Sequence, residues 1–186
     1  MRVQALADVP LRARNPGWVN EVRGLIEAAS DYYEREFNIR LVTQTVSAWP
    51  GEERIPSTPD LLNKLKQDFP LENKTAGYDL IVAFTATGVS RYLRDGRPRV
   101  DRIGNCAQGL GGFVVAPVSR VFLYGGPYAD LEFDVIALIH ELGHIFGAEH
   151  VDDTASVMHE DFGYRTEFDA KNRAVIKRNR SCAFAN

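Results

Sequence analysis

The sequence has few cysteines, no long apolar run and no marked excess of charge of one sign. Its two cysteines are too few for a disulfide framework and too far apart for a CxxC metal or redox pair. No run approaches the roughly 18 apolar residues of a membrane span. The net charge of −3 gives no electrostatic reason to bind nucleic acid. We therefore expect no transmembrane segment and no nucleic-acid partner.

What is present is an ordinary globular composition, with 45% hydrophobic and 25% charged residues in 186. That length predicts one domain, and we find neither an internal repeat nor a Gly/Ser linker. Helical and strand-like patterns alternate along the chain, which predicts an α/β layer fold. We expect strands at 2–9, 39–48, 78–84, 113–116 and 121–124. We expect helices at 16–36, at 58–70 and from 131, and a C-terminal helix that opens with a capping box at 166–169.

Histidine is rare and clustered, since all four histidines of the chain lie between positions 140 and 159. Three of them belong to the pattern HExxHxxGxxH, the known zinc-peptidase signature of the metzincins. His140 and His144 are four residues apart, so both leave the same face of a helix. His150 can reach the same ion only if the helix stops and the chain turns back. Gly147 allows that turn, because glycine tolerates the left-handed conformation that ends helices.

Three histidine ligands leave the fourth zinc position open to water, which is typical of a catalytic site. Glu141 follows the first ligand and is the expected general base. His159 is not expected to be a ligand, since it would close the open position. Met158 is either an ordinary core residue or the apolar floor of the metal site.

On these residues the chain resembles the metzincin zinc peptidases, and most closely the adamalysin or reprolysin type. The resemblance implies a five-stranded twisted mixed sheet with three main helices. It also implies a single catalytic domain over 1–186, with an upper part of about 1–147 and a lower part of about 148–186. The active-site helix would be followed by a Met-turn at Met158.

The resemblance further implies a zinc-dependent endopeptidase that cleaves extended polypeptides with a zinc-bound water. An edge strand would pair antiparallel with the substrate by strand addition. We expect that strand at Gly112, Phe113, Val114 and Val115. The pocket beside the cleaved bond would be walled by Phe162 and Tyr164.

A disulfide between Cys106 and Cys182 is also implied by the resemblance, although two separate buried thiols remain an alternative. A disulfide would indicate an oxidising, extracytoplasmic or secreted location. The N-terminus carries no signal sequence, so such a protein would be represented here by its mature form. A propeptide or inhibitor would lie outside this chain. No EF-hand-like spacing supports a calcium site.

Two other functions fit the same motif. One is a metzincin-fold binding module that has lost catalysis, although the presence of Glu141 argues against it. The other is a zinc aminopeptidase of narrow specificity resembling the archaemetzincins. That group carries extra cysteines after the third histidine, and those extra cysteines are absent here, since Cys182 is the one cysteine after His150.

Overall fold

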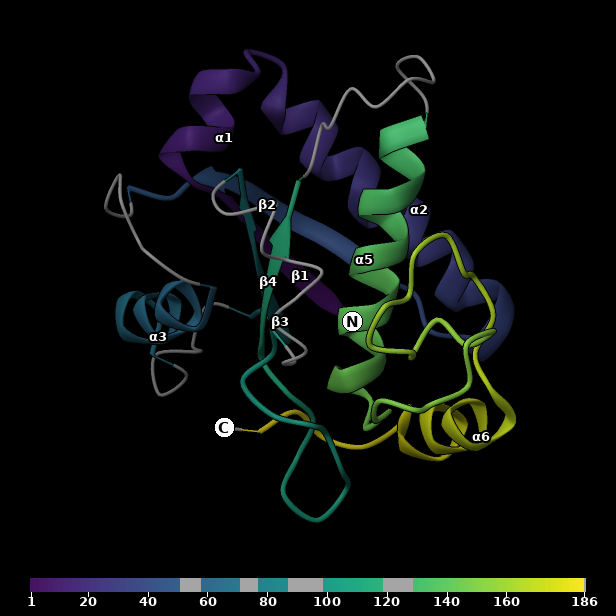
Figure 1. Cartoon of the computed structure of the whole chain (residues 1–186). Helices are drawn as coiled ribbons and strands as arrows, with labels where there is room; N and C mark the ends of the chain where they lie inside the picture. The colour runs from purple at the N-terminus through teal and green to yellow at the C-terminus, as the bar shows by residue number, and fades with distance from the viewer. Residues whose placement is uncertain (51–57, 71–76, 87–98, 119–128, 186) are drawn as a thin grey trace.

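The computed structural model describes residues 1–50, 58–70, 77–86, 99–118 and 129–185. Four strands form one sheet in the order β2-β1-β3-β4, and all three strand pairs are parallel (Figure 1). The predicted strand 121–124 lies outside the described residues. The strands are β1 (Arg2–Ala7), β2 (Val42–Ala48), β3 (Leu80–Thr85) and β4 (Phe113–Pro117).

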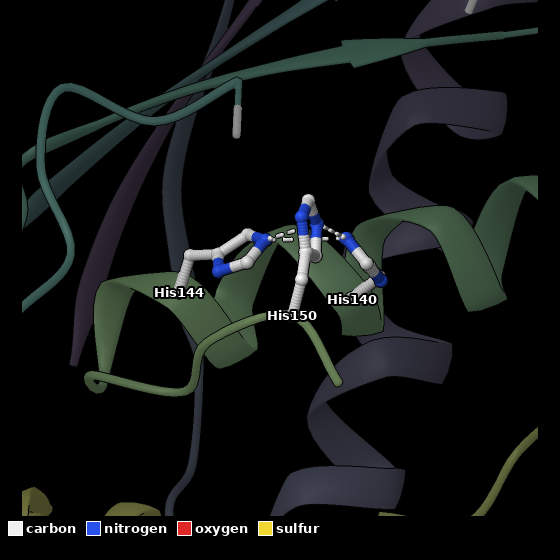
Figure 2. A group of neighbouring side chains, drawn as sticks. All are labelled: His140, His144 and His150. Carbon is white, nitrogen blue, oxygen red and sulfur yellow. Dashed lines mark hydrogen bonds between the residues drawn. The ribbon is translucent and has the colours of Figure 1, made fainter. Parts of the chain in front are cut away.

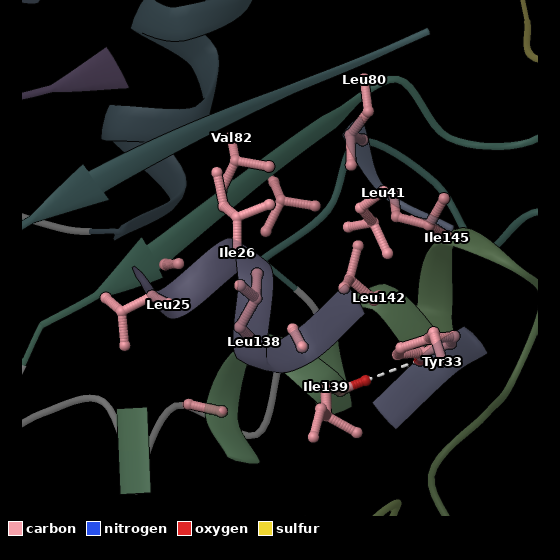
Figure 3. Close-up of a cluster of buried hydrophobic side chains, with 14 of the residues drawn as sticks. Leu25, Ile26, Tyr33, Leu41, Leu80, Val82, Leu138, Ile139, Leu142 and Ile145 are labelled. Atoms are coloured by element: carbon pink, nitrogen blue, oxygen red, sulfur yellow. Dashed lines mark hydrogen bonds between the residues drawn. The ribbon is translucent and has the colours of Figure 1, made fainter. Parts of the chain in front are cut away.

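Helices cover both faces of the sheet (Figure 1). Side chains alternate along β3, so Leu80 and Val82 point to one core while Ile81 and Ala83 point to the other. The larger core lies under α2 (Trp18–Phe37) and α5 (Ala129–Ile145), which pack on each other and on the sheet (Figure 3). The smaller core lies under α3 (Thr58–Asp68). A parallel sheet buried on both faces explains why β3 is an uninterrupted apolar run.

The predicted α/β sheet is confirmed in part, because one of its five predicted strands lies outside the described residues. In the described part of the chain it has four parallel strands, and a single antiparallel bridge joins Val100 to Val114. We call residues 99–101 the outer segment. The Val115 N–H donates to the Arg99 carbonyl at 2.8 Å, and the Asp101 N–H donates to the Phe113 carbonyl at 3.3 Å. So short a pairing leaves no periodic pattern in the sequence.

The outer segment also changes the interpretation of the predicted edge strand. β4 is the last of the four strands, as expected for Gly112, Phe113, Val114 and Val115. Its outer side is not open, however, because the outer segment already pairs with it. A peptide could add directly to β4 only by displacing the outer segment, so the substrate strand at these residues stays a prediction. At the β4 edge of the sheet, residues 99–101 lie outside β4.

Two helices begin where the sequence analysis did not expect them. A short helix, α1 (Val9–Arg14), follows β1 because the Asp8 carboxylate caps it, accepting from the Leu11 N–H at 2.8 Å. The final helix, α6 (Ala170–Asn179), is capped by Asp169, which accepts from the Asn172 N–H at 2.9 Å. It therefore begins after the predicted capping box at 166–169, because Glu167 is held in a bridge with Ser156.

No helix in the described ranges is long and apolar enough to cross a membrane.

Candidate metal centre and active site

Helix α5 presents His140 and His144 on one face, and the chain returns after it to bring His150 beside them (Figure 2). The helix ends in a Schellman motif, in which the Ala148 N–H donates to the Gly143 carbonyl and the Gly147 N–H to the His144 carbonyl. Gly147 has φ +94°, and a Cβ there would lie 2.3 Å from the Gly104 carbonyl oxygen. Glycine at this position is thus required both by the backbone conformation and by the space available.

The three imidazoles converge through their Nε2 atoms, which are 3.1, 3.2 and 3.2 Å apart (Figure 2). Nitrogens bound to one tetrahedral zinc at about 2.0–2.1 Å would be separated by about 3.3–3.4 Å. The arrangement therefore matches a three-histidine zinc site. Among the described residues, His140, His144 and His150 form a group of side chains that could hold a metal ion.

The second ring nitrogens of two ligands fix which tautomer is present. Nδ1 of His140 lies 2.7 Å from the Val157 carbonyl oxygen, and Nδ1 of His144 lies 2.7 Å from that of Ala148. A carbonyl can only accept, so each Nδ1 carries the proton and each Nε2 presents a lone pair to the centre. Lone pairs that face each other at 3.2 Å repel unless a cation lies between them. The site is therefore built for a cation.

Burial keeps the ligands neutral, which is the form that binds metal. It lowers the pKa of His140 well below its usual value and lowers the pKa of His144 to about 4. The pKa of His150 is also lowered, first by burial and then by the neighbouring His144. The three ligands are thus ready to bind zinc at neutral pH.

Glu141 is fully buried on α5 next to the first ligand. Burial raises the pKa of its carboxyl group, and the positive charge of Arg99 opposes that rise. Arg99 contacts both carboxylate oxygens: its backbone N–H donates to Oε2 at 2.9 Å, and its Nη1 lies 3.2 Å from Oε1. The carboxylate of Glu141 is therefore buried next to the first histidine and held from the outer segment.

Met158 is fully buried and packs against α5 at Gly143. A Cβ at Gly143 would lie 2.8 Å from the Met158 Sδ and 3.0 Å from the Phe168 ring. Gly143 therefore lets the methionine approach the helix closely. The Met158 N–H is held by Ser156 Oγ at 3.0 Å, and its carbonyl accepts from the Val151 N–H at 3.2 Å. Met158 is thus fixed in the core next to the helix that carries two of the histidines.

An aromatic row extends from the first ligand towards solvent. The Phe162 ring lies 4.7 Å from that of His140, and Phe133 stacks on Phe162 at 5.6 Å. Phe133 also meets Tyr164 edge-on at 5.7 Å, and Tyr164 is 64% exposed. The structure thus brings together both of the predicted pocket residues, and it adds Phe133 from α5.

His159 is partly buried, and its Nδ1 accepts from the Asp161 backbone N–H at 3.0 Å. It is not part of the ligand group. Cys106 and Cys182 are bonded to one another, with their Cα atoms 5.0 Å apart.

Three contributors to the site, Arg99, Gly143 and Phe133, were not singled out from the sequence. Arg99 is one of several arginines in an irregular stretch, and only strand pairing brings it to Glu141. Gly143 occupies a variable position of the motif, and an isolated glycine within a helical pattern was the available signal for close packing. Phe133 lies two turns before the first ligand on the same helix, a spacing that could have been noticed.

Comparison with solved structures shows the same fold in two archaeal proteins. Archaemetzincin from Methanopyrus kandleri is 20% identical with a TM-score of 0.62, and the alignment covers 97% of this chain and 95% of that chain. A zinc-dependent peptidase from Methanocorpusculum labreanum is 18% identical with a TM-score of 0.57, with 94% and 99% covered. Among curated proteins, no sequence match was found.

The model of one protein family matches almost the whole chain, over residues 3–186, and its description is metallo-peptidase family M12. The match includes the three converging histidines and the glutamate beside the first of them. The chain therefore belongs to metallopeptidase family M12 and is a metzincin-type zinc metallopeptidase.

Proposed function

We propose that this protein is a zinc-dependent endopeptidase that hydrolyses internal peptide bonds of extended polypeptides, with Glu141 as general base. The observation that carries the proposal is the convergence of three neutral imidazole nitrogens, 3.1 to 3.2 Å apart, beside a buried carboxylate on the same helix. His140, His144 and His150 would hold the ion. Met158 would form the Met-turn beneath it.

When bound, zinc supplies a Lewis acid that polarises a carbonyl and lowers the pKa of water. The residues of the chain transfer the proton and orient the metal ligands. Glu141 accepts a proton from water at its carboxylate and passes that proton to the departing amine. The Val157 and Ala148 carbonyls hold two ligand rings in the tautomer that faces the centre.

The substrate would lie as an extended strand along the outer segment rather than on β4. In an antiparallel pair, alternate residues direct their backbone groups to opposite sides. Arg99 and Asp101 bond to β4, so Val100 directs its N–H and carbonyl away from the sheet, where a peptide can pair with them. Phe162, Phe133 and Tyr164 would wall an apolar pocket for the side chain next to the cleaved bond.

The Arg99–Glu141 pair favours internal cleavage over removal of an N-terminal residue. An aminopeptidase must bind the free ammonium group of its substrate near the metal. Here the positive charge of Arg99 is buried against the carboxylate beside the first ligand, and it also acts on all three histidines. Because Arg99 already pairs with Glu141, that carboxylate is not free to bind a substrate ammonium group.

Cleavage of peptides with blocked ends tests this proposal. We expect the wild-type protein loaded with zinc to cleave internally quenched peptides whose two termini are both blocked. It should be much slower on aminoacyl substrates with a free N-terminus. Glu141→Gln is the matched control, since it keeps the shape and the zinc ligands. Cleavage confined to free N-termini would favour the aminopeptidase, and equal activity of Glu141→Gln would refute the general base.

The paired cysteines support a location in an oxidising compartment, because structural disulfides persist there and are rare in reducing cytosol. We therefore propose that the protein works outside the cytoplasm. Expression of the full-length gene product in its own cells, followed by fractionation and alkylation of free thiols, tests this. Detection of the protein in the cytosol with both thiols alkylated would contradict it.

A further inference from the structure

The contact between Arg99 and Glu141 joins two segments that are 42 positions apart in the sequence. Arg99 lies on the outer segment and Glu141 on α5, and their side chains are 6% and 0% exposed. One hydrogen bond comes from the Arg99 backbone and one from its guanidinium, and each binds a different carboxylate oxygen. Both ends of the carboxylate are therefore held by one residue.

The backbone of Arg99, which donates to Glu141, is itself held by the sheet. The Arg99 carbonyl accepts from the Val115 N–H at 2.8 Å, which fixes the peptide unit that follows Arg99. Two positions on, the Asp101 carboxylate accepts from the Gly112 and Phe113 N–H groups, each at 2.9 Å. The outer segment can leave Glu141 only by breaking these bonds, so it does not behave as a loosely attached lid.

A substitution at Arg99 removes the hydrogen bond from the guanidinium and leaves the one from the backbone. A glutamate side chain has three rotatable bonds, and one hydrogen bond fixes one oxygen but leaves the carboxylate plane able to turn about it. A second donor on the other oxygen fixes the plane. A carboxylate offers about four acceptor positions, so these two bonds are compatible with a water bound to the same group. Orientation of a catalytic group matters strongly, since an error of about 1 Å can cost about a hundredfold in rate.

We propose that Arg99 is the positioning residue of Glu141, orienting the general base through its backbone N–H and its guanidinium. This inference rests on the proposed peptidase function. The guanidinium sets the carboxylate plane, while the three histidines hold the metal without it. Loss of the guanidinium should therefore reduce turnover while leaving zinc binding and substrate affinity nearly unchanged.

The test compares Arg99→Met and Arg99→Lys with the wild-type protein, all loaded with zinc. Arg40→Met is the matched control, because Arg40 also pairs with a glutamate, Glu34 at 2.6 Å, but on the surface. Zinc content, thermal unfolding, kcat and KM on an end-blocked peptide are measured for each. For Arg99→Met we expect one zinc per chain, a KM within about twofold of wild type and a kcat reduced about 10- to 100-fold. The kcat of Arg99→Lys should lie between those of Arg99→Met and the wild-type protein. The kcat, KM and zinc content of Arg40→Met should match those of the wild-type protein.

A second readout does not depend on activity. Removing the partner of a buried charge is costly, so Arg99→Met should unfold at a lower temperature than wild type. Adding Glu141→Gln to Arg99→Met should recover part of that loss, because the uncompensated carboxylate is gone. If Arg99→Met fails to fold, the Arg99→Lys comparison decides alone.

The outcomes separate the two proposals. A folded, zinc-loaded Arg99→Met or Arg99→Lys with a kcat equal to or above wild type overturns the positioning role, and an increase would make the contact inhibitory. A reduced kcat accompanied by loss of zinc also overturns it, since Arg99 would then act on the metal site. If the wild-type protein cleaves no end-blocked peptide, the endopeptidase function fails, and the positioning proposal fails with it.

Discussion

The metal-ligand segment, residues 140–150, and the outer segment, residues 99–101, meet at Glu141 but are built in different ways. The ligand segment is held together by short-range geometry: an i, i+4 pair on α5 and one helix-ending glycine. The outer segment reaches Glu141 only because it pairs with β4 from outside. The geometry of the ligand segment follows from the spacing of its residues in the sequence. The position of the outer segment depends on the assembled sheet.

This difference implies a division of labour. The ligand histidines form hydrogen bonds to carbonyls at Val157 and Ala148, which belong to the same end of the chain. Their convergence does not depend on a bond from the outer segment. Changes to the ligand histidines should therefore abolish metal binding, whereas changes in the outer segment should act on catalysis with the metal in place.

The largest expected effect comes from breaking the ligand segment itself. His144→Ala removes one of three ligands and leaves two nitrogens, which do not complete a three-histidine site. We expect zinc content to fall from about one per chain to a small fraction, with activity lost, as measured by mass spectrometry and chelator competition. His159→Ala is the control and should keep its zinc, because His159 bonds only locally with Asp161. Full zinc retention in His144→Ala would contradict the site.

The disulfide joins the loop that follows the outer segment to the end of the chain, since Cys106 follows residues 99–101 and Cys182 follows α6. It closes a loop with a sequence separation of 76, for which loop entropy predicts about 4–5 kcal/mol of stabilisation. Cys106→Ser/Cys182→Ser should lower the free energy of unfolding by up to that amount in urea denaturation. An unchanged midpoint, with or without reductant, would show that the bond does not constrain the unfolded chain.

A smaller effect is expected where Met158 packs against the ligand helix. Gly143→Ala places a Cβ 2.8 Å from the Met158 Sδ, so the core must shift at a cost of about 1–3 kcal/mol. Gly24→Ala is the matched control, since that helical glycine has no atom within 4 Å of the added Cβ. It should stabilise the protein by about 0.5–1 kcal/mol. Equal effects of the two substitutions would contradict the close packing.

The smallest effect on stability is expected at the exposed end of the aromatic row. Tyr164 is 64% exposed, so Tyr164→Ala should change the free energy of unfolding by no more than about 0.5 kcal/mol. Its ring contacts Phe133, however, and its loss should change the relative rates for large and small apolar side chains by up to about tenfold. Profiling on a peptide library measures this. An unchanged preference would remove Tyr164 from the pocket.

The features of the fold and site that depend on short-range sequence patterns were predicted from the sequence. The HExxHxxGxxH spacing identified all three ligands, Glu141 and the turn at Gly147, and strong apolar periodicity located α2 and α5. Helix boundaries were less accurate. α2 begins at Trp18 rather than 16, because the Asn15 side chain bonds to the Gly17 N–H instead of capping the helix directly.

Features that depend on contacts between distant segments were not predictable from the sequence. The outer segment has a single bridge to β4 and no alternating pattern, so its place beside Gly112, Phe113, Val114 and Val115 could not be inferred. The same holds for Arg99, whose role follows from that pairing alone. The predicted disulfide came from the family resemblance, and the structure brings Cys106 and Cys182 together, with their Cα atoms 5.0 Å apart.

The most direct test of the central claim is anomalous scattering at the zinc absorption edge from crystals of the zinc-loaded protein. The account predicts one strong peak at the point where the three histidines converge, about 2.0–2.1 Å from the Nε2 atoms of His140, His144 and His150. A folded protein with no peak there, or with its zinc bound elsewhere, would contradict the metal centre and the proposed activity.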